Sequence, residues 1–253
     1  MIYKFKPIGI IHSCFREKFG IPRQACLVPE AEARLEMLPP YNRPEAFRGL
    51  DGFSHVLLSF VFHERGGNGG DWQPTVRPPR LGGNARVGVF ASRSPCRPNP
   101  LGISVVELGG VEYGEGRLTL LLKGVDLLDQ TPVLDIKPYV PYADCPPGAR
   151  GGYAEERPRA VLPVRFSERA LAQCAEWESH GHPGLRVLVT RLLELDPRPA
   201  CRNREDPLRM FGMKLLDFDV RWRVREGVVL VTEILPLESG TAKGQGGHGR
   251  NST

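Results

Sequence analysis

The sequence predicts a mainly β protein in which a barrel-like N-terminal domain precedes a small α+β C-terminal domain. As far as about Tyr142, short apolar segments alternate with Gly- and Pro-rich turns and show little helical periodicity, which favours a barrel or sandwich. From Pro146 to Arg159 the composition shifts to Pro, Gly and charged residues, as at a domain boundary. Two helical patterns and two apolar strands follow. We therefore expect domains at residues 1–150 and 158–237.

Size and composition set the class of protein. A chain of 253 residues, 41% hydrophobic and 25% charged, is typical of a soluble globular protein with ample core. It has no apolar run of the roughly 18 residues that cross a bilayer, and its N-terminus lacks the apolar region of a signal peptide. We therefore expect a cytoplasmic protein. The net charge of +5 permits a polyanionic partner without requiring one.

The first half of the chain contains several strand candidates. Tyr3 to Ile11 is short and rich in apolar residues, and predicts a first strand. Pro44 to Gly49 resembles one helical turn, with Pro early and Gly at its end. Phe53 to Phe62 is apolar and β-branched enough to predict a strand buried on both faces. Gly66 to Gly83 is dense in Gly and Pro, and a loop of that length is usually functional or disordered.

A second group of strands surrounds a Pro-rich loop. Val87 to Ala91 predicts a short strand that leads into this loop. Ile103 to Val111 and Leu118 to Val125 flank Tyr113-Gly114-Glu115-Gly116, which predicts a β-hairpin.

The C-terminal domain mixes helices and strands. Ser167 is a suitable N-cap for a helix that runs to about Ser179, and a second helix is expected from Leu185 to Leu195. Phe211 to Val224 and Val228 to Leu235 predict two strands joined at residues 225–227, because apolar and charged residues alternate there. The Gly-rich polar segment 238–253 is expected to be disordered.

The Pro-rich loop, residues 92–102, presents cations. Its prolines fix the backbone, and a stiff loop lowers the ordering cost of binding, while guanidinium groups suit carboxylates or phosphates. Arg93 and Arg97 lie in this loop, although charge alone would favour solvated loop arginines. We expect the loop to face residues 126–139, which carry three carboxylates, although Asp126 and Asp129 would also serve as turn formers.

Several common sites are absent from the sequence. Gly66 to Asp71 lacks the Lys-Ser/Thr ending of a phosphate loop, and no Gly-x-Gly-x-x-Gly follows a strand, which disfavours a Rossmann domain. His63-Glu64 has no second histidine at helical spacing, and the serines lack a nucleophile-elbow context. The 6 cysteines include no Cys-x-x-Cys pair, which argues against a zinc ribbon and a disulfide framework. We expect no metal, and a hydrolase is disfavoured.

Seven segments together resemble the TsaA-like family of tRNA adenine-37 N6-methyltransferases. They cover nearly the whole chain apart from the Gly-rich tail, and are residues 17–24, 48–55, 72–84, 90–104, 126–139, 196–200 and 217–222. The resemblance implies a non-Rossmann, barrel-like domain that binds S-adenosyl-L-methionine, with a small α+β domain and a homodimer. It also implies methylation of N6 of threonylcarbamoyladenosine at position 37 of threonine tRNA, in the anticodon loop.

The resemblance also implies which residues meet the cofactor. Arginines suit its carboxylate, aspartates suit its hydroxyls and cationic end, and apolar side chains suit adenine. Glu64 and Cys96 depart from the family pattern. The expected cofactor-binding residues are Pro22, Arg23, Gln24, His63, Glu64, Arg93, Leu101, Asp126, Leu127, Leu128 and Asp129.

Catalysis and tRNA binding need further groups. The target N6–H is flanked by a carbamoyl group and a purine and is therefore unusually acidic, so a modest general base would suffice, and Asp135 is the candidate. A basic surface must hold the tRNA phosphates, and the candidates in the second domain are Arg198, Arg202, Arg221 and Arg223. The alternative function is a non-catalytic sensor module that binds S-adenosylmethionine or RNA.

Overall fold

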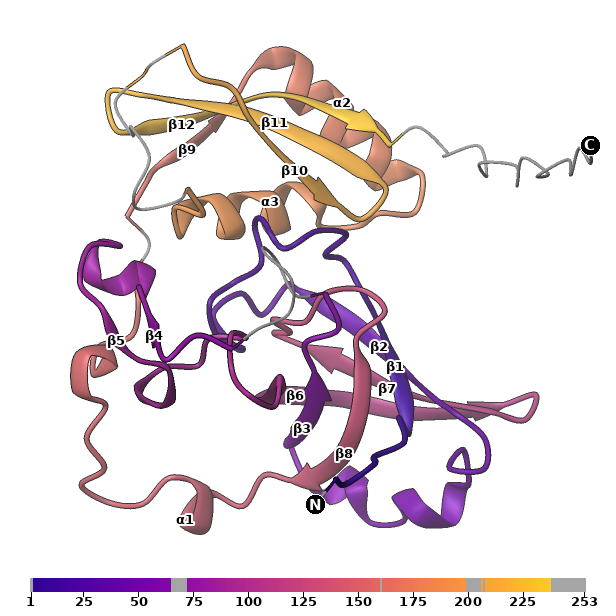
Figure 1. Ribbon diagram of the computed structural model, residues 1–253. Helices are drawn as coiled ribbons and strands as arrows, with labels where there is room; N and C mark the ends of the chain where they lie inside the picture. Colours follow the sequence, from indigo (N-terminus) through magenta and orange to yellow (C-terminus); the bar gives the residue numbers. More distant parts are fainter. Residues whose placement is uncertain (1, 65–71, 160, 199–205, 207, 238–253) are drawn as a thin grey trace, which may run out of the picture.

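The mainly β fold with a small C-terminal α+β part is confirmed by a computed structural model that describes residues 2–64, 72–159, 161–198, 206 and 208–237. Six strands form a closed barrel in the order β1-β2-β7-β6-β3-β8, and four strands form a second sheet in the order β10-β11-β12-β9. In Figure 1 the second sheet and its helices lie over one end of the barrel. No helix in the described part of the chain is long and apolar enough to cross a membrane.

Every ladder of the barrel is antiparallel. The first and last strands close it, because Gly9 pairs with Val133. Inward side chains such as Leu35, Leu58 and Leu120 are fully buried. The barrel strands are β1 (Gly9–Ser13), β2 (Glu32–Met37), β3 (His55–Val61), β6 (Leu101–Gly114), β7 (Arg117–Lys123) and β8 (Pro132–Pro138).

The predicted hairpin is present and is longer than expected. Strands β6 and β7 meet at Glu115-Gly116, which have φ of 52° and 74°. Positive φ at both central residues is the geometry that two-residue hairpins favour. At its other end β6 includes Gly102, where a Cβ atom would lie 2.2 Å from Cζ of Phe60. Glycine there lets the Phe60 ring pack directly against the backbone of β6.

Two predictions for the first half of the chain were wrong in extent. The first strand begins at Gly9 rather than Tyr3, since its ladders with β2 and β8 both start at Gly9. Of Val87 to Ala91, only β5 (Val87–Gly88) is a strand, and it pairs with β4 (Thr75–Val76). The short 3-10 turns are η1 (Pro44–Phe47), η2 (Leu50–Gly52), η4 (Pro79–Leu81), η5 (Val89–Ala91) and η6 (Gly152–Ala154), and α1 covers Pro141–Asp144.

The second domain packs two helices on its sheet. Ser167 caps α2 as expected, because its Oγ accepts a hydrogen bond from Ala170 N at 3.1 Å. The predicted strand from Phe211 to Val224 is in fact two strands, separated by a turn at Leu216, whose φ is 54°. The elements are β9 (Val164–Phe166), α2 (Glu168–Ser179), α3 (Leu185–Glu194), β10 (Phe211–Leu215), β11 (Phe218–Arg225) and β12 (Val228–Pro236). The Gly-rich tail, 238–253, lies outside the described residues.

The turn at Leu216 belongs to a domain joint, which we define as residues 13–19 with residues 214–222. The backbone N of Leu216 donates to Cys14 O at 2.7 Å, and Phe15 forms an antiparallel bridge with Leu215. The ring of Phe19 stacks on that of Trp222, with centroids 5.8 Å apart. These contacts make one continuous core from the two domains.

Candidate active site

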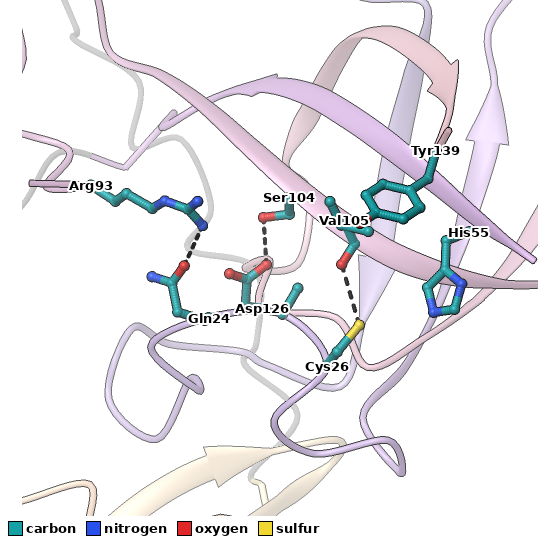
Figure 2. A pocket seen from close by; sticks show the side chains of 9 residues that line it. Gln24, Cys26, His55, Arg93, Ser104, Val105, Asp126 and Tyr139 are labelled. Carbon is teal, nitrogen blue, oxygen red and sulfur yellow. Dashed lines mark hydrogen bonds between the residues drawn. The ribbon is translucent and has the colours of Figure 1, made fainter. Parts of the chain in front are cut away.

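An open pocket of about 310 Å³ lies on the barrel and gathers residues from distant parts of the sequence. Gln24, Ala25 and Cys26 come from the loop after β1, and Arg93 comes from the Pro-rich loop. Figure 2 shows Arg93 and Gln24 at one end, Asp126 and Ser104 between, and His55 with Tyr139 at the other end. The complete lining is Gln24, Ala25, Cys26, His55, Arg93, Ser104, Val105, Asp126 and Tyr139.

The carboxylate of Asp126 is held at the centre of the pocket. Ser104 Oγ donates to Asp126 Oδ1 at 2.7 Å, and Ser104 is 5% exposed. Burial raises the pKa of Asp126, while the Ser104 hydrogen bond and the positive charge of Arg93 act in the opposite direction. A carboxylate that loses hydration in this way favours a cationic partner.

The cationic end of the pocket consists of Arg93. Its guanidinium points at Gln24 and donates to Gln24 Oε1, and Arg93 is exposed. Arg97 is used differently, because it donates to the backbone oxygens of Ser92 at 2.6 Å and Val89 at 3.2 Å. The two arginines of the Pro-rich loop therefore have separate roles. Arg97 fixes the loop, and Arg93 meets the pocket.

The opposite end of the pocket is aromatic. The rings of His55 and Tyr139 meet edge to face, with centroids 6.2 Å apart, and Tyr139 N donates to His55 O at 3.0 Å. His55 Nδ1 lies 2.8 Å from Ser54 Oγ. An aromatic edge of this kind suits a purine or another flat ring.

The wall at residues 24–26 is held by backbone contacts. Cys26 has a φ of 59°, and its N donates to Gly124 O at 2.7 Å. Arg157, from the linker between the domains, donates to Cys26 O at 2.8 Å. Burial raises the pKa of the Cys26 thiol, so this cysteine stays protonated at neutral pH.

Three of the expected cofactor residues, Gln24, Arg93 and Asp126, come together in this pocket. Neighbouring Pro22 is buried and Arg23 is exposed, and neither belongs to the described lining. Leu127 is 1% exposed and lies in the core, while Leu128 O accepts from Thr131 Oγ1 at 2.6 Å.

Asp129 is engaged at the domain joint. It accepts from Ser13 N at 3.0 Å and lies 2.5 Å from Arg16 Nη1. Arg16 also reaches Leu216 O at 3.1 Å and Asp217 Oδ1 at 3.2 Å.

His63, Glu64 and Leu101 lie at a different end of the strands. His63 and Glu64 follow Val61, the end of β3 opposite His55, and Leu101 pairs with Val61. His63 Nδ1 is 3.4 Å from Thr131 Oγ1, and Glu64 Oε2 is 3.9 Å from Lys18 Nζ. The expected cofactor residues are therefore divided between two places within one copy of the chain.

The expected general base, Asp135, also lies outside the described pocket lining. It sits on β8, accepts from Ile136 N at 3.0 Å and pairs with Lys137.

The arginines expected to bind tRNA have different environments. Arg198 is 6% exposed and forms a two-point ion pair with Asp196, at 2.7 Å and 3.0 Å. Arg221 is partly exposed and pairs with Asp219 at 3.0 Å and Glu233 at 3.4 Å. Arg223 Nε is buried and makes no hydrogen bond within the described chain. Arg202 lies outside the described residues.

The sequence did not identify the other residues that line the pocket. Ser104, His55 and Tyr139 each end a segment that carries the family resemblance, but their residue types did not distinguish them from structural positions. Ala25, Cys26 and Val105 gave no signal in the sequence either. In the described part of the chain, no group of three or more His, Cys, Asp or Glu side chains could hold a metal ion.

The class of protein is defined by its fold, a closed β-barrel that carries this pocket and is joined to a small α+β domain. Comparisons with known proteins identify the family. The family model of the tRNA-methyltransferase O N-terminal domain matches residues 10–145, and that of the TrmO C-terminal domain matches residues 159–237. These two matches identify a tRNA methyltransferase built on a β-barrel. The chain belongs to the tRNA-methyltransferase O (TrmO) family.

Individual relatives agree with this assignment. A tRNA (adenine(37)-N6)-methyltransferase of Escherichia coli is 46% identical over 88% of this chain and 94% of its own. A putative S-adenosylmethionine-dependent methyltransferase of Pseudomonas aeruginosa is 48% identical over 88% of this chain and 93% of its own. The crystal structure of TrmO from Pseudomonas aeruginosa matches with a TM-score of 0.76 at 41% identity, over 92% of this chain and 98% of that one.

Proposed function

We propose that the protein uses S-adenosylmethionine to methylate N6 of threonylcarbamoyladenosine at position 37 of threonine tRNA. The family and the names of the relatives support a tRNA (adenine-37 N6)-methyltransferase. The observation that carries the proposal is the order of groups along the pocket, with Arg93 at one end, Asp126 in the middle and the aromatic pair at the other.

The pocket matches the cofactor group by group. Arg93 suits the carboxylate of the methionine part, since a guanidinium pairs well with a carboxylate. Asp126 suits the cationic centre, and His55 with Tyr139 suits a purine. The pocket of about 310 Å³ is within the ordinary range for sites that bind small molecules.

The residues of this chain mainly position the reactants. S-adenosylmethionine, when bound, supplies an electrophilic methyl group. Holding the acceptor nitrogen in line with that group accounts for most of the expected acceleration. Asp126 and His55 are the two ionisable side chains of the pocket that can accept the N6 proton, whereas Asp135 is paired outside it. We therefore no longer propose Asp135 as the base.

Recognition of tRNA is assigned to arginines of the second domain. Arg221 and, on the same face of β11, Arg223 remain candidates, together with Arg202. Arg198 is removed from this proposal because its guanidinium is buried and paired with Asp196. A buried arginine gains little from a phosphate and contributes instead to the fold.

A homodimer is also part of the proposal, and the divided cofactor set supports it. His63 and Glu64 lie beyond the end of β3 opposite His55, so a second copy could bring these residues to the pocket of the first. Mixed dimers of Arg93→Ala and His63→Ala chains test this arrangement. Partial recovery of activity on mixing, from two variants that are weak alone, is the expected result, and no recovery would count against it. We place the enzyme in the cytoplasm with its tRNA substrate.

The decisive experiment is methyl transfer from labelled S-adenosylmethionine to threonine tRNA, with and without prior threonylcarbamoylation. We expect label at position 37 only in the threonylcarbamoylated tRNA. Label in both tRNAs would make adenosine itself the acceptor. Binding of cofactor without any transfer would favour the alternative, a non-catalytic module that senses S-adenosylmethionine or RNA.

A further inference from the structure

The hydroxyl of Ser104 differs from the other buried hydroxyls of the barrel. Ser13 Oγ donates to Leu127 O at 2.7 Å, and Thr131 Oγ1 donates to Leu128 O at 2.6 Å. These two groups satisfy the backbone of the chain. Ser104 Oγ instead donates to a carboxylate oxygen that lines the pocket, at 2.7 Å.

Ser104 is a polar residue among apolar side chains. It lies on the inward face of β6, between Gly102 and Val106, and opposite Leu58 of β3. The other inward side chains near it are apolar and buried. A buried hydroxyl costs free energy unless it is hydrogen-bonded. The partner that satisfies it here is Asp126.

The hydrogen bond has two physical effects on Asp126. It fixes the rotation of the Asp126 carboxylate about the Cβ–Cγ bond, because Ser104 Oγ holds the Oδ1 atom. It also stabilises the charged form, which opposes the upward shift of the pKa that burial causes. Without Ser104, the carboxyl group would be both less oriented and more easily protonated.

We propose that Ser104 is a positioning residue that keeps the Asp126 carboxylate charged and aimed at the cationic part of S-adenosylmethionine. This inference rests on the proposed function, because it needs the cofactor in this pocket. A purely structural role makes a different prediction. If Ser104 only filled the barrel, its loss would change stability and leave the pH dependence of cofactor binding unchanged.

The test is calorimetric binding of S-adenosylmethionine across acidic to alkaline pH. Ser104→Ala should weaken binding about tenfold at neutral pH, as expected for losing a hydrogen bond to a charged group. The midpoint below which affinity is lost should move to higher pH, since protonated Asp126 no longer attracts a cation. Ser104→Thr keeps the hydroxyl and should restore the midpoint. Ser13→Ala removes a matched buried hydroxyl and should leave the midpoint unchanged.

The outcomes separate the inference from the function on which it rests. If Ser104→Ala binds S-adenosylmethionine with the affinity and pH midpoint of the wild type, the proposed role of Ser104 is wrong, and the cofactor site stays in place. Failure of the wild-type protein to bind S-adenosylmethionine would overturn the proposed function instead, and the role of Ser104 with it. If Ser104→Ala does not fold, Ser104→Cys preserves the volume with a weak donor, and its midpoint should likewise move to higher pH.

Discussion

At the scale of single residues, hydrogen-bond partners decide which of several similar side chains can act. Arg93 and Arg97 lie four positions apart in one loop, yet the guanidinium of Arg97 donates to the backbone oxygens of Ser92 and Val89. Arg93 keeps its guanidinium at the pocket, where it donates to the amide oxygen of Gln24. A ligand carboxylate can replace that neutral partner.

Replacing Arg93 should therefore weaken cofactor binding and leave the fold intact. We expect Arg93→Ala to cost about 1.5–3 kcal/mol in the binding of S-adenosylmethionine, as for other hydrogen bonds to charged groups. Calorimetry measures this change. Arg117→Ala, an exposed arginine of the β6–β7 hairpin, is the control. Equal affinity in the two variants would remove Arg93 from the site.

Replacing Asp126 should separate stability from binding. Burial raises the pKa of Asp126, so the native state binds its proton more tightly than the unfolded state. Stability then falls as pH rises from the unfolded pKa through the raised folded pKa. Asn carries no charge, so Asp126→Asn removes this loss of stability and should raise the Tm at neutral pH. In acid, where Asp126 is protonated, the Tm of the variant should no longer exceed that of the wild type.

The same variant should bind S-adenosylmethionine about tenfold more weakly, because the charge that meets the cationic centre is gone. Thermal melts at acidic and neutral pH, with calorimetry at neutral pH, measure both effects. Unchanged affinity would support the simpler view of Asp126 as a turn former.

At the scale of elements, the domain joint is what makes two sheets behave as one molecule. Residues 13–19 leave β1 of the barrel and supply partners to the turn between β10 and β11. Phe15 is 1% exposed within this joint, and Arg16 bridges Asp129 of the first domain and Asp217 of the second. The ion pairs are partly exposed and contribute little, so the apolar contacts dominate.

Truncating Phe15 should therefore be strongly destabilising. We expect Phe15→Ala to lower the free energy of unfolding by about 3–5 kcal/mol, as for other buried aromatic residues. Phe5→Ala is the matched control, because Phe5 is 70% exposed and such changes stay within about 0.5 kcal/mol. Urea denaturation measures both. A small effect at Phe15 would mean that the domains are stabilised independently.

At the scale of the whole molecule, tRNA binding should depend on salt and cofactor binding should not. Each lost phosphate contact makes the plot of log affinity against log salt concentration less steep, by about 0.7–0.9 in slope. We expect Arg221→Ala to raise the KM for tRNA with this flattening and to leave S-adenosylmethionine affinity unchanged. Filter binding over a range of salt concentrations measures the slope. A wild-type slope in Arg221→Ala would mean that the phosphate contact lies elsewhere, on Arg77 and Arg80 of the first domain.

Arg198→Ala should behave differently from Arg221→Ala. Its two-point pair with Asp196 is buried, and breaking a buried pair by removing one partner costs about 3–5 kcal/mol of stability. We therefore expect a lower Tm and an unchanged salt slope, measured in the same experiments. A flattened slope without loss of stability would return Arg198 to the tRNA surface.

The sequence determined the elements whose signals are local. An apolar, β-branched run indicated β3, although only alternate residues of β3 are buried. A turn signal indicated the hairpin of β6 and β7, alternation indicated β11 and β12, and capping indicated α2, because these patterns depend on neighbours within a few residues. The family resemblance indicated Gln24, Arg93 and Asp126, since their segments match over long runs. The mainly β class followed from the same local patterns.

Only the tertiary structure decided the closure of the barrel and the composition of the pocket. The turn at Leu216 carries no Gly or Asn signal and depends on the backbone of Cys14, a partner 202 residues away in the chain (216 − 14). Ser104, His55 and Tyr139 become site residues only because strands β3, β6 and β8 lie side by side in the barrel. The physical reason is that hydrogen bonding and burial depend on distance in space, which the order of residues leaves open until the barrel closes.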